Sequence, residues 1–280
     1  MHHDRQPDHA AFASRAEMRD RIEGPAGTVI VTLPRGRVAA RDRVARAAAL
    51  GAPLLVDGQK TDGVDSMLKE LRRRAPVGEV IAKAHGKLFA LPSTDLSDWR
   101  VEPAHMAEGF LAPPGGFSPD AVDPGSRELI AALPPLSGRV VDLGAGWGAL
   151  AAAVLESPGV ERLDLVEAHR PSLDCARENI ADPRAAFHWA DATDWRPEAS
   201  ADHVVTNPPF HQGRDADPAL GRAFLATAAA ALKPHGTLWL VANRHLPYES
   251  ALHFLFAEVE ERPGSTAFKL YRAARPRRRR

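Results

Sequence analysis

The chain has 280 residues, 44% of them hydrophobic and 26% charged, which is typical of a globular protein long enough for two domains. No apolar stretch is long enough to span a bilayer, and the N-terminus MHHDRQPDHAAF lacks the apolar run of a secretory signal. The one cysteine, Cys175, cannot form a disulfide within the chain and is expected to be a small buried apolar residue. We therefore expect a cytoplasmic protein without a membrane segment.

The formal net charge of zero conceals an uneven distribution of charge. Residues 1–110 carry 17 lysines and arginines against 15 acids, residues 111–271 carry 13 against 21, and residues 272–280 carry six arginines. Because an acidic surface repels phosphate, a nucleic acid would have to be bound by the N-terminal part or by the arginine tail. The twelve histidines are scattered and cysteine occurs once, so the sequence predicts no metal site.

Two breaks in composition divide the chain. The stretch LAPPGGFSPDAVDPGS, residues 111–126, is rich in proline, glycine and aspartate, and RPRRRR ends the sequence. We place the domain boundary at residue 111. This gives an N-terminal domain over residues 1–110, a second domain over residues 111–273, and a basic tail over residues 274–280 that is expected to be disordered.

The apolar periodicity of the N-terminal part predicts a small α/β domain. Strands are expected at residues 28–33, 52–56, 78–84 and 87–91, with helices at residues 37–50 and 62–75. The PRGR after the first strand lacks the glycine pairs of a nucleotide-binding loop, so no cofactor is expected there. Two groups of cations can instead meet RNA phosphates, although ordinary solvated helix faces would explain them equally well: Arg35 and Arg37, and Lys83 and Lys87.

The second domain shows a longer alternation of strands and helices. Strands are expected at residues 139–144, 162–167, 185–190, 202–207 and 236–243, and helices at residues 149–157, 170–180, 218–234 and 248–256. Strands separated by helices indicate a parallel sheet with right-handed crossovers. Two last strands, at residues 258–263 and 266–272, are joined by a tight PGS turn and are expected to form an antiparallel hairpin.

The turn after the first of these strands, in VVDLGAGWGALA, contains Gly144, Gly146 and Gly148. Glycines there let the backbone bend sharply and let a ligand approach the bare chain, but the spacing also fits a dinucleotide-binding turn. Glu167 and Asp191 end the next two strands, where their carboxylates can accept hydrogen bonds from ribose hydroxyls and from an adenine amino group. Together the glycines and acids predict a ligand that carries adenosine.

The fourth strand ends in NPPFHQG, whose prolines make the chain leave the sheet rigidly. An exocyclic amine of guanine or adenine is a poor nucleophile, because its lone pair is delocalised into the ring. The side-chain carbonyl of Asn207 and the backbone carbonyl of Pro208 can accept its hydrogens and aim the lone pair at a methyl group, while Phe210 stacks on the base. These three are the predicted catalytic residues, and four more are proposed to contact the base: Pro209, His211, His245 and Tyr248. A local hydrogen bond would also explain His211, and a loop that only packs would explain His245 and Tyr248 equally well.

These motifs, from DLGAGWG to NPPF, resemble those of class I S-adenosylmethionine-dependent methyltransferases over roughly residues 115–273. GGFSPDAVDPGS, NPPFHQG, VANRHLPY and FKLYRA are further similar to the bacterial ribosomal RNA guanine-N2 methyltransferases, above all the small-subunit (16S) family. The resemblance implies a Rossmann-like seven-stranded sheet with an antiparallel last strand, and a degenerate N-terminal duplicate that recognises RNA without binding cofactor. It also implies S-adenosylmethionine as cofactor, with contacts from Phe117, Asp123, Ser126, Asp142, Gly144, Gly146, Gly148, Glu167, Asp191, Ala192 and Asn207.

We therefore predict a monomeric cytoplasmic enzyme that methylates guanine N2 of 16S ribosomal RNA, acting on the RNA or on the small ribosomal subunit. Adenine-N6, large-subunit guanine-N2 and protein glutamine methylation remain open as other activities. A catalytically silent RNA-binding factor in ribosome assembly would keep the same fold. An NAD-dependent dehydrogenase is disfavoured, because it leaves NPPF and the terminal hairpin unexplained.

Overall fold

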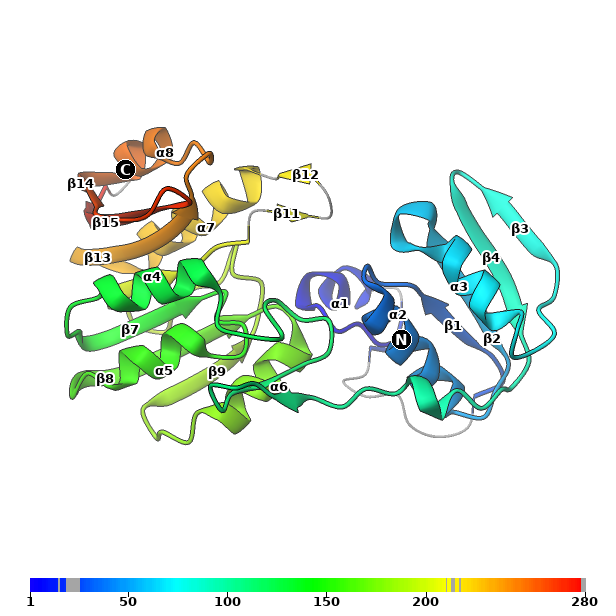
Figure 1. The fold of residues 1–280 in the computed structure, drawn as a ribbon. Coiled ribbons are helices and arrows are strands. Elements are labelled where there is room, and N and C mark those ends of the chain that lie inside the picture. The colour runs from blue at the N-terminus through cyan, green and yellow to red at the C-terminus, as the bar shows by residue number, and fades with distance from the viewer. Residues whose placement is uncertain (15, 19–25, 210, 213–214, 217, 278–280) are drawn as a thin grey trace. The chain divides into compact units, whose positions relative to one another are not determined.

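The computed structural model describes most of the chain, namely residues 1–14, 16–18, 26–209, 211–212, 215–216 and 218–277. The chain forms two compact units, which are Arg19–Pro103 and a larger unit that joins Met1–Met18 to Ala104–Arg280. Each unit has its own sheet and its own helices (Figure 1). Within the described ranges no helix is both long enough and apolar enough to cross a membrane.

The division between the units differs from the predicted one at both ends of the smaller unit. It falls after Pro103 and not at residue 111, because β5, Ala104–His105, pairs with β6, Leu111–Ala112, inside the larger unit. The first residues also belong to the larger unit, where they include α1, Gln6–Phe12. The backbone N–H of Gln6 donates to the carbonyl of Ala168 at 2.9 Å, which fastens this segment beyond the end of a strand of the larger sheet.

The smaller unit confirms the predicted α/β alternation. Its sheet has the order β1-β2-β4-β3, in which β1 and β2 are parallel and the other pairs are antiparallel. Alternate residues of β1 and β2 share one apolar core with both helices, so the helices cover a common face of the sheet. The elements are β1 Val29–Thr32, α2 Arg37–Ala48, β2 Leu54–Gln59, η1 Lys60–Asp62, α3 Val64–Leu71, β3 Val80–Lys83, β4 Gly86–Leu91 and η2 Ser97–Trp99.

The larger unit contains a seven-stranded sheet of order β14-β15-β13-β10-β7-β8-β9. Strand β15 is antiparallel to both of its neighbours, whereas the pairs from β13 to β9 are all parallel. The predicted Rossmann-like sheet with an antiparallel last strand is thereby confirmed. Its strands are β7 Ser137–Leu143, β8 Gly159–Glu167, β9 Ala185–Trp189, β10 Ala201–Thr206, β13 Leu232–Asn243, β14 Phe256–Arg262 and β15 Phe268–Pro276.

Helices cover both faces of this sheet (Figure 1). Val141 and Leu143 of β7 pack in one apolar cluster with α7 and α8, whereas Val140 packs in another with α5. Burial on both faces explains the continuous apolar runs from which the strands were predicted. The helices are α4 Pro124–Ala132, α5 Ala149–Leu155, α6 Arg170–Asn179, α7 Pro218–Ala231 and α8 Glu249–Leu255.

Two predictions at the ends of the second domain need correction. The proline- and glycine-rich stretch at residues 111–126, where no helix was predicted, includes the first residues of α4, which begins directly after Asp123. The stretch taken as a disordered tail begins inside β15, because Ala274 pairs with both Thr237 and Glu258. Arg277 is also held, since its backbone N–H donates to the carbonyl of Leu255 at 2.7 Å. Residues 278–280 of the predicted tail lie outside the described residues.

A small apolar cluster fastens the segment before α4 to the turn after β7. It contains Trp147 and Cys175, and burial raises the pKa of the Cys175 thiol to about 11, as expected for a core cysteine. The indole N–H of Trp147 donates to the carbonyl of Phe117 at 3.0 Å. Asn179 completes the clamp: its amide bonds to both the N–H and the carbonyl of Leu111, at 2.7 and 2.8 Å, and to the carbonyl of Trp147 at 2.8 Å.

Asn179→Ala is expected to destabilise the protein by about 2–3 kcal/mol, because it removes the hydrogen-bond partner of three backbone groups, on half-buried Leu111 and buried Trp147. Urea unfolding with a fluorescence readout measures the change. Arg177→Ala is the matched control on the same helix, since Arg177 makes an exposed ion pair with Asp174 and is expected to change stability by less than about 1 kcal/mol. Equal effects of the two substitutions would contradict the proposed clamp.

Candidate active site

The turn between β7 and α5 has the backbone geometry that its glycines allow. Gly144, Gly146 and Gly148 have φ values of 76°, 58° and 98°, in the left-handed region that side chains disfavour. A Cβ on Gly148 would lie 2.8 Å from the Ile180 side chain, so this glycine permits close packing. A Cβ on Gly146 would meet nothing within 4 Å, so this stretch of bare backbone faces open space. The turn therefore offers a cradle for a ligand.

Glu167 lies at the end of β8 and is bound to this turn. Its two carboxylate oxygens accept from the backbone N–H of Gly146 at 2.9 Å and of His169 at 2.7 Å. Burial raises the pKa of Glu167, and these two hydrogen bonds and the charge of Arg5 act against the rise. Each oxygen keeps a lone pair beyond these bonds, so the carboxylate can still accept from two ligand hydroxyls.

Asp191 follows β9, the next strand of the sheet. Its Oδ1 accepts from the backbone N–H of Thr193 at 2.9 Å and from the Thr193 hydroxyl at 2.8 Å, which fixes the carboxylate in a tight turn. Ala192 beside it is buried. Because β7, β8 and β9 are parallel neighbours, their carboxyl ends bring the glycine turn, Glu167 and Asp191 to one edge of the sheet.

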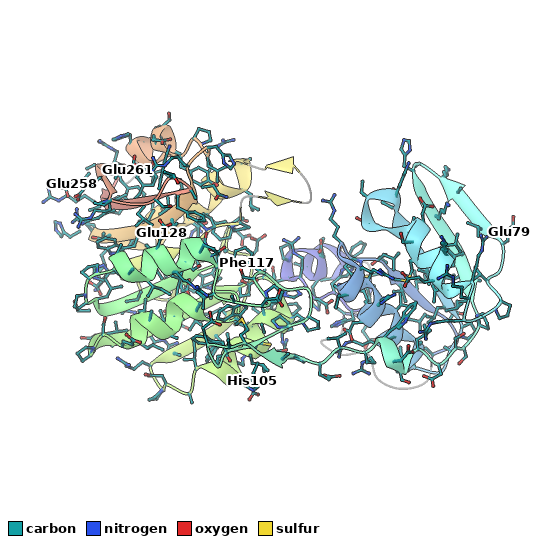
Figure 2. The ribbon with its side chains drawn as sticks, in the orientation of Figure 1. Glu79, His105, Phe117, Glu128, Glu258 and Glu261 are labelled. Carbon is teal, nitrogen blue, oxygen red and sulfur yellow. The ribbon has the colours of Figure 1, made fainter. Side chains whose placement is uncertain are left out.

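A cavity of about 380 Å³, including its open mouth, lies beside the glycine turn. It is lined from the loop before α4, from the first turn of α4, from the glycine turn and from the end of β10. Figure 2 marks Phe117 in the loop before α4, where its side chain is half exposed. The cavity thus gathers residues that are far apart in the chain and that the sequence predicted as a set: Phe117, Asp123, Ser126, Gly144, Gly146 and Asn207.

Asn207 directly follows β10 and is held by the start of α4. Its side-chain Nδ2 donates to Asp123 Oδ2 at 2.8 Å and to the Ser126 hydroxyl at 2.9 Å. Asp123 is the N-cap of α4, and the same Oδ2 accepts from the Ser126 backbone N–H at 2.9 Å. Sequence reasoning assigned Asp123 and Ser126 to the cofactor and missed their contact with Asn207. The aspartate before Pro-Gly-Ser is a helix-start signal that could have revealed the cap.

None of the other described residues predicted to touch the base lines this cavity. Tyr248 is fully buried in the core, and its hydroxyl lies where a side chain on Gly221 of α7 would have to go, so its placement contradicts a direct contact with the base. His245 and Pro209 are exposed, and Pro208 is buried. His211 begins β11, His211–Gln212, which pairs with β12, Asp215–Ala216. Phe210 lies outside the described residues.

Asp142 is fully buried at the end of β7, beneath the glycine turn. Burial and the neighbouring charge of Glu167 raise its pKa to about 8, and the Ala151 backbone N–H offsets the rise only in part. Neither carboxyl oxygen has a hydrogen-bond partner of ordinary geometry among the described residues. The structure thus places this predicted cofactor contact as a buried carboxyl group at the end of β7, and it does not line the cavity.

Asp142→Asn is expected to flatten the pH dependence of stability between about pH 4 and pH 8. The folded protein holds a proton on Asp142 up to about pH 8, whereas the unfolded chain loses it near pH 4, so wild-type stability falls as pH rises through this window. The variant cannot ionise at this position. Its free energy of unfolding should therefore rise relative to that of the wild type by up to ~1.4 kcal/mol per pH unit. Urea unfolding of both proteins from pH 5 to pH 9 measures the difference; a constant difference would contradict the raised pKa.

The four predicted RNA-contacting cations lie on the smaller unit. Arg37 makes an ion pair with Glu70 at 2.7 Å, and Arg35 lies 3.5 Å from Asp62. Lys87 is paired with Asp65. Lys83 is exposed on β3 and makes no ion pair with any other described residue. Acidic side chains within the unit thus partly balance three of the four charges. Of these four cations, Lys83 is the most available to phosphate. No cluster of metal-ligating side chains occurs in the part of the chain that the structure describes.

The N-terminal segment is a feature of the site that the sequence did not indicate. The backbone of Arg5 forms a bridge with His169, two residues beyond Glu167. The His9 ring meets the Trp189 ring edge-on, with 4.9 Å between centroids. The segment has no motif or periodicity that ties it to β8, so only the folded chain reveals this contact.

The sheet order, the glycine turn after β7 and the Asn-Pro-Pro element after β10 define a class I methyltransferase. The methyltransferase small domain family model matches residues 108–272, and the chain belongs to this family. Known proteins agree with the assignment. The chain is 30% identical over 265 residues to ribosomal RNA small subunit methyltransferase C of Shewanella sp. strain MR-4, a match that covers 87% of this chain and 76% of the relative.

Two further comparisons cover nearly the whole chain. The enzyme of the same name from Klebsiella pneumoniae is 30% identical over 275 residues, which are 95% of this chain and 80% of that protein. Among solved structures, the chain resembles the Thermus thermophilus 16S rRNA N2 G1207 methyltransferase in complex with AdoMet and guanosine. The TM-score is 0.81 with 26% identity, covering 98% of this chain and 81% of that one. The resemblance inferred from the motifs is thereby confirmed.

Proposed function

We propose that this protein transfers a methyl group from S-adenosylmethionine to the exocyclic N2 of a guanine in 16S ribosomal RNA. The observation that carries the proposal is the placement of Asn207, whose amide is held at a cavity that it shares with Gly144 and Gly146. The names of the relatives support the substrate, because they are small-subunit ribosomal RNA methyltransferases. The solved relative was captured with AdoMet and guanosine, which supports both the cofactor and the base.

The residues at this edge of the sheet fit the cofactor. The bare backbone of Gly146 can lie against it at the cavity that Gly144 also lines, and the remaining lone pairs of Glu167 can accept from the two ribose hydroxyls. Asp191 has one carboxylate oxygen outside its turn, which can accept from the adenine amino group. When bound, S-adenosylmethionine supplies a methyl group on a positively charged sulfur.

The Asn-Pro-Pro element provides what the base amine needs. The amide carbonyl of Asn207 and the backbone carbonyl of Pro208 accept the two amine hydrogens, which draws the nitrogen lone pair out of the ring plane. That lone pair forms the new N–C bond as the S–C bond breaks, and the amine then releases one proton to water or along its acceptors. No strong base is required, because the nitrogen becomes acidic as it is methylated. Phe210 is proposed to stack on the base.

The smaller unit is proposed to bind the RNA backbone. Of the four cations predicted to contact RNA, Lys83 is the most available, and Arg35, Arg37 and Lys87 are proposed to contribute by exchanging their acidic partners for phosphate. His211 and His245 are proposed as further contacts with the RNA near the target base. We propose that the protein acts as a monomer in the cytoplasm, on ribosomal RNA or on the small subunit.

Methyl incorporation followed by nucleoside mass spectrometry tests the function. Purified protein and labelled S-adenosylmethionine are incubated with a 16S transcript, a 23S transcript and small subunits that lack the modification. We expect N2-methylguanosine in the 16S RNA, as free RNA or in the subunit. N6-methyladenosine, label in 23S RNA alone, or label in protein would each overturn the proposal. If calorimetry detects no binding of S-adenosylmethionine, the protein is instead a silent RNA-binding factor.

A further inference from the structure

We infer that Asp123 and Ser126 are positioning residues for methyl transfer, which fix the orientation of the Asn207 amide. The inference rests on the proposed function, in which the carbonyl oxygen of Asn207 accepts a hydrogen from the base amine. It concerns a different question, namely what makes that oxygen, and not the amide nitrogen, face the substrate. The two side chains come from the first turn of α4, 84 and 81 residues away from Asn207 in the chain.

The hydrogen bonds of Asn207 use its whole donor capacity. An amide NH₂ group has two hydrogens, and here one reaches Asp123 Oδ2 at 2.8 Å while the other reaches the Ser126 hydroxyl at 2.9 Å. The carbonyl oxygen Oδ1 then lies at the opposite edge of the planar amide group, directed away from Asp123 Oδ2 and the Ser126 hydroxyl. Because all three residues line the same cavity, this side is where a substrate amine can meet it.

The charge of Asp123 decides which way the amide faces. The oxygen and nitrogen ends of an amide are nearly identical in shape, so packing alone selects neither. A carboxylate only accepts hydrogen bonds, and it would repel a carbonyl oxygen turned towards it. Oδ2 of Asp123 is also fixed in place, since it accepts from the backbone N–H of Ser126 at 2.9 Å. Only the NH₂ group of Asn207 can therefore face this carboxylate, to which it donates a hydrogen bond.

The same contact makes Asn207 a better acceptor. A hydrogen bond to an ionised acceptor is stronger than a neutral one, and it polarises the amide so that negative charge gathers on Oδ1. During transfer the guanine nitrogen gives its lone pair to the methyl carbon, the S–C bond breaks with its electrons leaving on sulfur, and the N–H hydrogens become more acidic. The bond to Oδ1 thus strengthens in the transition state, which raises kcat more than substrate affinity.

A purely structural role for Asp123 makes a different prediction. Asp123 caps α4, and serine caps helices about as well as aspartate does. Asp123→Ser should therefore keep the helix while removing the carboxylate from Asn207, because the serine side chain is one atom shorter than an aspartate. Ser126→Ala removes the second acceptor and keeps the backbone N–H that the cap needs. The double variant leaves the NH₂ group of Asn207 without either partner.

The test compares these variants with Glu128→Gln, which changes a carboxylate on the same helix. Glu128, which is labelled in Figure 2, accepts from the backbone N–H of Ser265 at 3.1 Å and is not among the residues that line the cavity. For each protein we measure kcat at saturating cofactor and RNA, the Kd for S-adenosylmethionine by calorimetry, and Tm. We expect the double variant to lose roughly 10- to 10²-fold in kcat, with a cofactor Kd within about threefold of wild type and a Tm near that of Glu128→Gln. Each single variant should lose part of that kcat.

The outcomes separate this inference from the proposed function. A double variant with kcat within about twofold of wild type overturns the inference. So does a loss confined to cofactor affinity, which would instead make Asp123 and Ser126 cofactor ligands as the sequence suggested. Asn207→Ala is measured alongside. If Asn207→Ala stays active, the proposed function is wrong. If Asn207→Ala is inactive while the double variant is fully active, only the inference about Asp123 and Ser126 is wrong.

Discussion

Asn207→Ala is expected to lower kcat for methyl transfer by at least about 10²-fold, because it removes an acceptor aimed at the hydrogens that become acidic in the transition state. Loss of a single preorganised hydrogen-bonding group has effects of this size in other enzymes. The Kd for S-adenosylmethionine is expected to change only a few-fold, since the glycine turn and Glu167 are untouched. Single-turnover transfer to 16S RNA and calorimetry measure the two quantities separately.

Thr206→Val is the matched control for this substitution. Thr206 immediately precedes Asn207, is fully buried, and donates its hydroxyl to the carbonyl of Leu143 at 2.7 Å. Valine has nearly the same shape, so the variant tests whether any disturbance at the end of β10 is enough to stop the reaction. It should lower stability by about 1–3 kcal/mol and retain most of the activity. If Thr206→Val loses as much kcat as Asn207→Ala, the amide of Asn207 has no special part in the chemistry.

The fold was largely predictable, because its signals are local. The strands of the larger sheet are buried on both faces, so they appear in the sequence as short continuous apolar runs such as RVVDLG and GTLWLVAN. The antiparallel hairpin followed from the short turn before β15, which leaves no room for a crossover helix. Helix α4 was missed because proline, glycine and aspartate dominate its approach, although Asp123 and Pro124 are ordinary helix-start residues.

The site was predictable as a set of residues but not as a set of contacts. The carboxyl ends of neighbouring parallel strands lie at one edge of the sheet, so the sequence alone could place Gly146 close to Glu167. The bond from Asn207 to Asp123 joins a strand end to a helix cap, and no periodicity links positions 84 residues apart. Tyr248 was misplaced for a related reason: its burial depends on the small Gly221 of α7, which contacts it only in the folded chain.

Gly146→Val is expected to weaken binding of S-adenosylmethionine by roughly 10²-fold or more, because the valine side chain would take the space that the bound cofactor needs. The backbone at Gly146 has φ 58°, and a side chain there would project into space where nothing lies within 4 Å. The fold can therefore hold the new side chain, apart from the strain of a left-handed conformation, which costs roughly 1–2 kcal/mol. A bound cofactor cannot share that space, so affinity should fall far more than stability. Calorimetry and thermal unfolding measure the two effects.

Gly109→Val is the control that shows how much of the effect comes from backbone strain and how much from exclusion of the cofactor. Gly109 has φ 87°, lies between β5 and β6 in the same unit, and likewise has nothing within 4 Å of a Cβ. The two variants should therefore show similar falls in Tm, because both place valine in the left-handed region. Only Gly146→Val should lose the cofactor, since Gly109 does not line the cavity. If both variants lose affinity equally, the loss reflects general strain; if Gly146→Val binds within about threefold of wild type, the cofactor does not lie against this turn.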